Sequence, residues 1–132
     1  MSIEQNKQFV RKFFERADCG DVGGALELFA DDVCWTSVGS TRFSGTYAGK
    51  EELVADLVDP LFRELQGGIR HELRNFVAEG DHVVAEVSGR AITRDGRPYN
   101  NRYCFVFRLA DGRIREVTEY MDTELVTAAF GR

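Results

Sequence analysis

The spacing of the apolar residues changes once along the chain, near Ile69, and this change constrains the fold more than any other feature. Before it, apolar side chains recur every three or four residues, which is the spacing of one face of a helix. After it, they alternate with polar side chains, as in half-buried strands. Helices followed by strands predict an α+β domain, with the helices packed on one face of a bent antiparallel sheet.

Two helices are expected near the N-terminus. Ser2 and Gln5 fit a capping box at the start of the first helix, and Gly20 ends that helix. Asp21 can cap a second, short helix whose apolar spacing continues to Phe29.

A third helix is expected over residues 50–66, where leucines at positions 53, 57, 61 and 65 are in phase. Pro60 lies inside it and predicts a kink or a break near Asp59. Between the second and third helices, Asp31–Asp32 is interpreted as a turn or cap that ends the second helix, and residues 33–37 as a strand.

The second half of the chain is interpreted as strands only. They are expected over Ile69–Ala78, His82–Thr93, Tyr99–Leu109 and Arg113–Met121. Asp-Gly pairs at 95–96 and 111–112 separate the later strands, and Asp-Gly favours hairpin turns that need positive φ.

The strand expected over Tyr99–Leu109 is apolar on both faces. Phe105 and its alternate neighbours form one face, while Cys104 and Val106 belong to the other. A monomer with helices on one side of its sheet needs only one apolar face. The second face needs a cover, and a partner subunit is the expected one.

Composition excludes several classes of protein. The 132 residues correspond to a single domain, residues 1–132. A net charge of −5 argues against nucleic-acid binding, and no run of 18 apolar residues predicts a membrane span. No signal peptide is recognised, and the three scattered cysteines suggest neither a disulfide framework nor a zinc site, so a cytoplasmic protein is expected.

Three stretches together resemble the SnoaL-like group of the nuclear transport factor 2-like superfamily. They are residues 20–35, with Leu-Phe-Ala-Asp-Asp-Val-Cys-Trp at their end, residues 45–51, Gly-Thr-Tyr-Ala-Gly-Lys-Glu, and residues 99–123. The resemblance covers nearly the whole chain. It implies a cone-shaped, cystatin-like α+β barrel, in which a strongly curved, mainly antiparallel sheet and three N-terminal helices enclose a deep apolar pocket. It also implies a homodimer through the outer face of the sheet.

The superfamily includes ketosteroid isomerases, whose site combines a carboxylate base, a tyrosine on the first helix and a protonated aspartic acid on a later strand. Residues 35–40 carry no carboxylate here, and residues 103–109 contain no acid. Phe13 and Phe14 stand where the tyrosine would be. Steroid isomerisation by that mechanism is therefore not expected.

The limonene-epoxide hydrolases of the superfamily use an Asp–Arg–Asp arrangement. By rough alignment, Glu119 occupies the position of one aspartate. Glu86 occupies the position of the arginine, and Ser88 that of the other aspartate. This charge pattern disfavours epoxide hydrolysis, which is kept as the less favoured alternative. SnoaL-type cyclases need only one acid/base group and an apolar pocket that folds the substrate, and this requirement is met.

Glu119 is the main catalytic candidate. It alternates with Val117 and Met121, so on an inward face it would be a carboxyl in an apolar cavity, a good environment for an acid/base. On an outward face it would be a solvated or ion-paired residue. His71 is a second candidate, as a proton shuttle or as a structural histidine.

Weaker candidates complete the predicted site. Glu86 could be a second pocket acid or could face outward, and Asp122 lies at the end of a strand, where a cap or a surface position is the alternative. His82 is expected to be exposed. Side chains expected to bind the substrate are Phe14, Trp35, Tyr47, Tyr103, Val117 and Met121. No residue cluster suggests a metal, and no cofactor is expected.

Two functions follow from these residues and the resemblance. The first is a lyase, isomerase or cyclase that binds a small apolar, cyclic or polyketide-like molecule and uses acid/base catalysis. The alternative is a ligand-binding domain of the same fold that does no chemistry. Convergent ionisable groups in the pocket would favour the enzyme, and a purely apolar lining would favour the binding domain.

Overall fold

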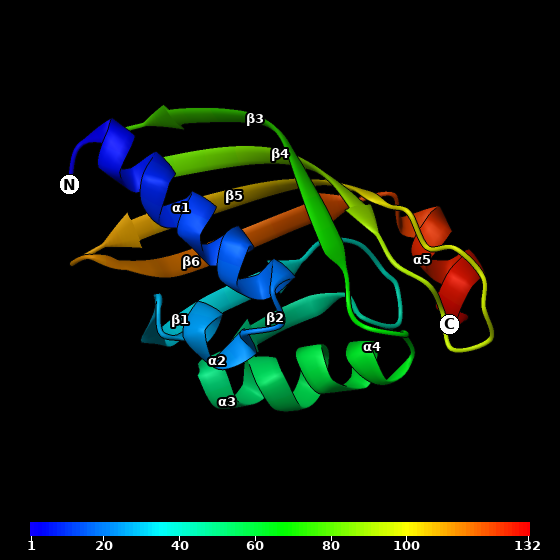
Figure 1. The fold of residues 1–132 in the computed structure, drawn as a ribbon. Coiled ribbons are helices and arrows are strands. Elements are labelled where there is room, and N and C mark those ends of the chain that lie inside the picture. The colour runs from blue at the N-terminus through cyan, green and yellow to red at the C-terminus, as the bar shows by residue number, and fades with distance from the viewer.

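The computed structural model describes residues 1–132 and has a six-stranded curved sheet flanked by helices (Figure 1). The helical segments are α1 (Ile3–Asp18), α2 (Val22–Leu26), α3 (Lys50–Leu53), the π-helical turn η1 (Val54–Val58), α4 (Asp59–Arg63) and α5 (Thr123–Phe130). The strands are β1 (Phe29–Ser37), β2 (Gly45–Ala48), β3 (Arg70–Glu79), β4 (His82–Arg90), β5 (Arg102–Ala110) and β6 (Arg113–Met121). The α+β class expected from the sequence is confirmed.

The sheet has the strand order β2-β1-β6-β5-β4-β3. All neighbours are antiparallel except β1 and β6, which run parallel because the chain crosses back to β6 from the β3–β5 meander. The turn between β5 and β6 uses Asp111 and Gly112, both at positive φ, as the Asp-Gly pair predicts. Strands β4 and β5 are shorter than expected, since residues 91–101 form a loop held by two isolated bridges.

The N-terminal helices follow the sequence closely. The reciprocal capping box of Ser2 and Gln5 is present, and the Asp21 side chain accepts from the Gly24 N–H at 2.8 Å. The interpretation of Asp31–Asp32 as a turn or cap was wrong. Both residues lie in β1, where the pairing with β6 is irregular, and their carboxylates point to solvent beside Lys50 and Arg115.

The third helix is continuous from Lys50 to Arg63 but changes pitch at η1, directly before Asp59 and Pro60. The sequence predicts a kink or a break near Asp59; the structure has a change of pitch without a break, because Pro60 has no N–H to continue the α-helical ladder. Leucines four residues apart drift by about 40° per step around a regular α-helix. The wider π-helical turn offsets this drift, and the leucines at 53, 57, 61 and 65 all reach the same cavity.

Two elements were not anticipated, the short strand β2 and the helix α5. The Asp122 side chain caps α5 by accepting from the Leu125 N–H at 3.2 Å. At the other end, Arg97 donates to the carbonyls of Ala128 and Ala129, and Arg42 donates to that of Phe130. The prediction that only strands follow residue 69 was therefore wrong for the last helix.

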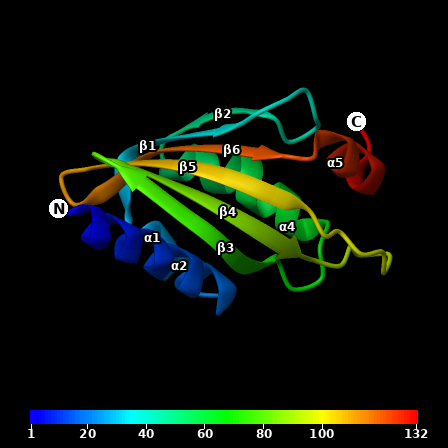
Figure 2. The same ribbon diagram turned by 90° about the horizontal axis from the view of Figure 1, so that it is seen from above.

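The helices lie on the concave face of the sheet, with α1 and α2 toward one edge of this face and α3–α4 toward the other (Figure 2). Between them the core is largely aromatic. Phe14 meets Phe105 and Phe107 edge-on, with centroids 5.4 and 5.8 Å apart, and Phe13 stacks on Phe29 at 5.2 Å. This aromatic core forms the floor of the cavity described below. No helix has the length and apolar character needed to cross a membrane.

Candidate functional site

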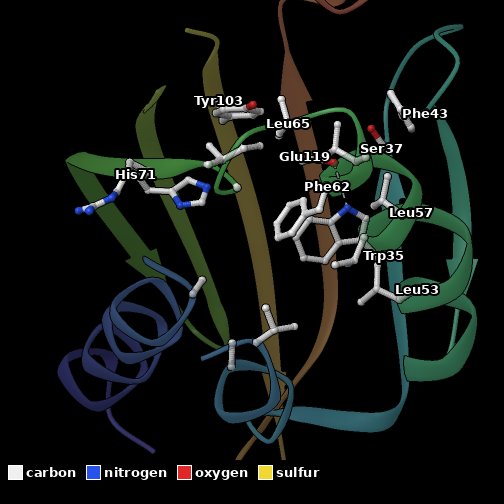
Figure 3. Close-up of a pocket in the computed structure, with 18 of the residues that line it drawn as sticks. Trp35, Ser37, Phe43, Leu53, Leu57, Phe62, Leu65, His71, Tyr103 and Glu119 are labelled. Atoms are coloured by element: carbon white, nitrogen blue, oxygen red, sulfur yellow. Dashed lines mark hydrogen bonds between the residues drawn. The ribbon is translucent and has the colours of Figure 1, made fainter. Parts of the chain in front are cut away.

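A cavity of about 510 Å³ lies between the concave face of the sheet and the helices. Residues from α1, α2, the segment α3–α4, the strands β1, β3, β5 and β6, the loops between them, and α5 line it. Of its 32 lining residues, 22 are hydrophobic, and the few polar groups stand at separate points of the wall (Figure 3). An apolar cavity with a few convergent polar groups is the usual form of a small-molecule site.

One polar point is Glu119 on β6, which faces the cavity. The Trp35 indole N–H donates to Glu119 Oε1 at 3.1 Å, and Ser37 lies directly beside Glu119 across the parallel β1–β6 pair (Figure 3). Burial raises the pKa of the Glu119 carboxyl, while hydrogen bonds from Trp35 and Ser37 and the charge of His71 partly oppose this shift. Glu119 therefore keeps its proton to higher pH than an exposed glutamate does.

The second polar point is His71, at the start of β3, paired with Asp18 near the end of α1. His71 Nδ1 lies 2.7 Å from Asp18 Oδ1, and the His71 backbone N–H is 3.2 Å from each carboxylate oxygen. Both side chains line the cavity and are mostly buried. The carboxylate accepts from Nδ1, which leaves Nε2 as the nitrogen that can exchange a proton with a ligand.

Two tyrosines form the third polar point. Tyr103 on β5 is buried, and its ring centroid is 6.4 Å from that of His71. Burial raises the pKa of Tyr103 well above its usual value, with Tyr99 and Glu119 adding to the effect, and burial also raises the pKa of Tyr99. Asn101 is fully buried and donates to the Tyr99 hydroxyl at 3.0 Å. Both phenols therefore remain neutral hydrogen-bond donors at any ordinary pH.

The structure brings most of the predicted residues together. Those lining the cavity are Phe14, Trp35, His71, Tyr103, Glu119 and Met121. Two predicted substrate contacts lie elsewhere: Val117 is packed in the core, and the Tyr47 hydroxyl donates to the Phe43 carbonyl at 2.7 Å.

Two of the weaker catalytic candidates also lie outside the cavity. Glu86 is exposed on the opposite face of β4 and accepts from Asn75 at 3.1 Å. Asp122 caps α5. His82 is half exposed, as expected, and pairs with Asp81 at 2.8 Å. Glu86 and Asp122 therefore take no part in the site proposed below.

Sequence reasoning missed six polar residues of the cavity: Asp18, Ser37, Thr41, Arg70, Arg94 and Tyr99. Asp18 stands 53 positions before His71, so no local pattern links the two. The alternation of β1 could have indicated Ser37, since Val33 and Trp35 share its face. No group of three or more His, Cys, Asp or Glu side chains is arranged to hold a metal ion.

The SnoaL-like domain family matches residues 10–117, which include most residues that line the cavity but not Glu119. The chain belongs to the SnoaL-like family. A curated relative of this SnoaL-like protein, an uncharacterized protein of Mycobacterium bovis, is 25% identical over 130 residues, 98% of each chain.

Solved structures give the same fold for this SnoaL-like protein. An NTF2-like protein of Burkholderia xenovorans aligns with a TM-score of 0.81 and 27% identity over 98% of each chain. A putative SnoaL-like polyketide cyclase of Jannaschia has a TM-score of 0.80 at 21% identity, covering 99% of this chain and 95% of the other. TerC, crystallised with polyporic acid, has a TM-score of 0.82 at 21% identity, with coverages of 94% and 96%.

Proposed function

We propose that this SnoaL-like protein is an acid/base enzyme that moves protons on a small, mainly apolar, cyclic molecule carrying a carbonyl group. One observation carries the proposal: the Asp18–His71 pair and Glu119 face the same apolar cavity from different walls (Figure 3). Groups whose environments suit them to opposite proton-transfer roles are typical of general acid/base sites.

His71 is the base of the proposed mechanism. Asp18 accepts from Nδ1, fixes the ring and stabilises the imidazolium that forms when Nε2 takes a proton. The contacts of Asp18 with the His71 backbone hold the pair rigidly across two elements. The aromatic rings of Phe14 and Phe105, with centroids 5.3 and 6.4 Å from the imidazole, limit the access of water to this base.

Glu119 is the acid. Burial raises the pKa of Glu119, which favours the protonated carboxyl that can donate to a carbonyl oxygen, and Trp35 then stabilises the carboxylate left behind. In the proposed step, His71 Nε2 removes a proton from the carbon next to the carbonyl, and Glu119 protonates the oxygen to give an enol. Where a carbon–carbon double bond is conjugated with this enol, His71 returns its proton to the far end of the dienol while Glu119 takes back the hydroxyl proton, which completes an isomerisation. Alternatively, the enol carbon attacks a second carbonyl of the same molecule and forms a ring, the hydroxyl proton returns to Glu119, and the imidazolium of His71 protonates the new alkoxide.

The ligands of structural neighbours support a cyclic substrate with oxygen functions. TerC was crystallised with polyporic acid, and the Jannaschia protein is described as a putative polyketide cyclase. A cavity of about 510 Å³ is within the range that holds a ligand of this general size.

The first test is exchange of carbon-bound hydrogen in D₂O, with 1-tetralone as an apolar cyclic ketone. NMR should show protein-catalysed loss of the proton signal next to the carbonyl. His71→Asn and Glu119→Gln should each slow the catalysed exchange by about 10²–10⁴-fold. Asp18→Asn should also slow it, because the ring would lose the carboxylate that stabilises its charged form.

The chain offers a matched control for the Asp18–His71 pair. Asp81 and His82 form a similar contact at 2.8 Å, but both are half exposed and lie outside the cavity. Asp81→Asn and His82→Asn should leave exchange unchanged. If the variants at His71 and Glu119 exchange as fast as the parent protein, the acid/base proposal is wrong.

A second candidate function is ligand binding without chemistry, which the hydrophobic majority of the lining favours. Mass spectrometry of small molecules that co-purify with the protein would identify the ligand in either case. A bound ligand that is recovered unchanged after prolonged incubation, together with no exchange in 1-tetralone, would support the binding role.

We also propose that the protein is a homodimer through the outer face of the sheet. One cross-strand row on this face consists entirely of β-branched residues: Val77, Val84, Val106, Thr118, Thr36 and Thr46. Tyr120, on the same face, is 48% exposed. Sedimentation should give about twice the 14.9 kDa chain mass, and Val106→Glu should shift the protein to monomer. A parent protein that sediments as a monomer would refute the proposal.

A further inference from the structure

Positive charge gathers at one edge of the cavity, although the chain as a whole carries a net charge of −5. Arg70 and Arg94 are the only Lys or Arg residues among those that line the cavity. Arg70 begins the edge strand β3, and Arg94 lies in the loop between β4 and β5. Both residues are exposed, so they stand where the cavity meets solvent.

No acidic side chain neutralises these arginines. Neither Arg70 nor Arg94 has a carboxylate within 4.0 Å, and the two acids of the cavity are engaged elsewhere, Asp18 with His71 and Glu119 with Trp35. Six other arginines of the chain do form ion pairs: Arg16, Arg42, Arg74, Arg97, Arg108 and Arg115.

A like charge lies directly opposite Arg70. Arg90 on β4 is its cross-strand partner, and Arg90 too has no ion pair. Two like charges placed opposite each other destabilise a strand pair, and a bound anion would remove this cost. Alternation along β3 turns Arg70 away from His71, so Arg70 borders the cavity only at its solvent edge, and Arg90 is not part of the cavity lining.

Arg94 is held in place by the backbone around it. Its Nε donates to the Arg63 carbonyl at 2.7 Å, and its own N–H donates to the Glu64 carbonyl at 2.9 Å. Gln66 in turn donates to the Arg94 carbonyl at 3.1 Å. The terminal guanidinium nitrogens make no hydrogen bond within the protein, so they are available to a ligand while the side chain is already ordered.

We infer that the edge of the cavity at Arg70 and Arg94 binds an anionic group, a carboxylate or a phosphate, on a ligand whose apolar body fills the cavity. The inference rests on the proposed function, in that this cavity is taken as the substrate site. It makes the substrate an amphipathic anion. The anionic group stays at the solvent edge, next to the residue that precedes His71 in the chain, and the reacting carbonyl lies inside.

Matched amphiphiles test the inference. Decanoate, decyl phosphate and 1-decanol share one apolar chain and differ in the head group. Their binding can be followed by calorimetry and by the fluorescence of Trp35, the single tryptophan, which lines the cavity. At low salt, at least one of the two anions should bind about tenfold more tightly than 1-decanol, and this preference should fall as salt is added. Which anion binds more tightly distinguishes a carboxylate from a phosphate substrate.

Charge variants locate the site. Arg70→Gln removes a charge without breaking any hydrogen bond of the protein, and Arg94→Gln tests the second arginine. Each should reduce the preference for the anion severalfold and leave the affinity for 1-decanol unchanged. Arg113→Gln is the control, since Arg113 is exposed, forms no ion pair and is not part of the cavity. It should keep the full preference.

Several results would overturn the inference: equal binding of the anions and the alcohol, binding of none of the three, or an anion preference that survives both Arg70→Gln and Arg94→Gln. The outcome is independent of the acid/base proposal. An anion preference without any exchange in 1-tetralone would leave the anion site standing and refute the proposed chemistry. Exchange in 1-tetralone without an anion preference would support the proposed chemistry and refute the anion site.

Discussion

Gly89 determines where the ring of Tyr103 can lie, and Gly89→Ala should move that ring. Gly89 is the cross-strand partner of His71 on β4. A methyl group at this position would be 2.7 Å from Tyr103 Cε2 and 3.3 Å from Ile69 Cγ2. Carbon atoms pack best at about 3.5–4.0 Å, so the ring must shift by roughly 1 Å. The backbone has little freedom to yield, because the Gly89 N–H donates to the Asn101 carbonyl at 2.8 Å.

The displaced ring can move only toward the cavity that it lines, and there it loses its present packing. Tyr103 is 8% exposed and stacks on Phe105 with a centroid distance of 5.4 Å. Overpacking of this kind costs about 1–3 kcal/mol. The smaller entropy of the unfolded alanine chain offsets ~0.4–1 kcal/mol of that. A net loss of about 1–2 kcal/mol should lower the Tm by roughly 3–8 °C. If Tyr103 contacts the substrate, exchange in 1-tetralone should also slow.

Thermal melts measure the cost of Gly89→Ala, and two further variants test its origin. Gly23→Ala in α2 is the control, because a methyl group there meets no atom within 4 Å, and it should not lower the Tm. Tyr103→Leu removes the ring, so Gly89→Ala should cost much less in that background. An equal cost in both backgrounds, or no cost in the parent, would refute the steric argument.

Three other perturbations have definite expected results. The raised folded-state pKa of Glu119 means that its protonated carboxyl favours the folded state at low pH, and that this contribution is lost as the pH rises through the folded pKa. The Tm of Glu119→Gln should therefore be higher than that of the parent protein at pH 8, and the difference should vanish near pH 4. Parallel melting curves would contradict this. Ser2→Ala removes the hydroxyl that accepts from the Gln5 N–H and should cost about 1 kcal/mol in urea unfolding, whereas a variant of unchanged stability would show that the cap is not used. Asn101→Leu leaves the Asp122 backbone and the Tyr99 hydroxyl without a buried partner, so it should destabilise the protein by about 2–4 kcal/mol; a loss below 1 kcal/mol would mean that water replaces the amide.

Local signals in the sequence account for most of the secondary structure. The capping box at Ser2, the Asp21 cap and the Asp-Gly turn at 111–112 act within four residues, so they can be identified without tertiary contacts. The change of apolar spacing near Ile69 separates helices from the meander, because each element must bury one face. Pro60 marks the change of helix pitch, since a missing N–H acts on its own turn.

The elements that sequence reasoning missed depend on distant partners. Strand β2 is only four residues long and mostly exposed, and it exists because β1 supplies its hydrogen bonds. Helix α5 has eight residues, and its last carbonyls are satisfied by Arg97 and Arg42, which come from two other loops. A helix this short is marginal by itself, so its stability comes from contacts that no local pattern contains.

The candidate site divides in the same way. Alternation along β6 fixes which residues share a face with Glu119, but only the curvature of the sheet decides that this face lines a cavity. The pairing of His71 with Asp18 joins the start of an edge strand to the end of a helix 53 residues earlier. The sequence by itself determined most of the elements and the alternation of side chains along them, because these follow from interactions between near neighbours. The tertiary structure alone decided which ionisable groups share one cavity, because that depends on how the elements pack and how far packing removes each group from water.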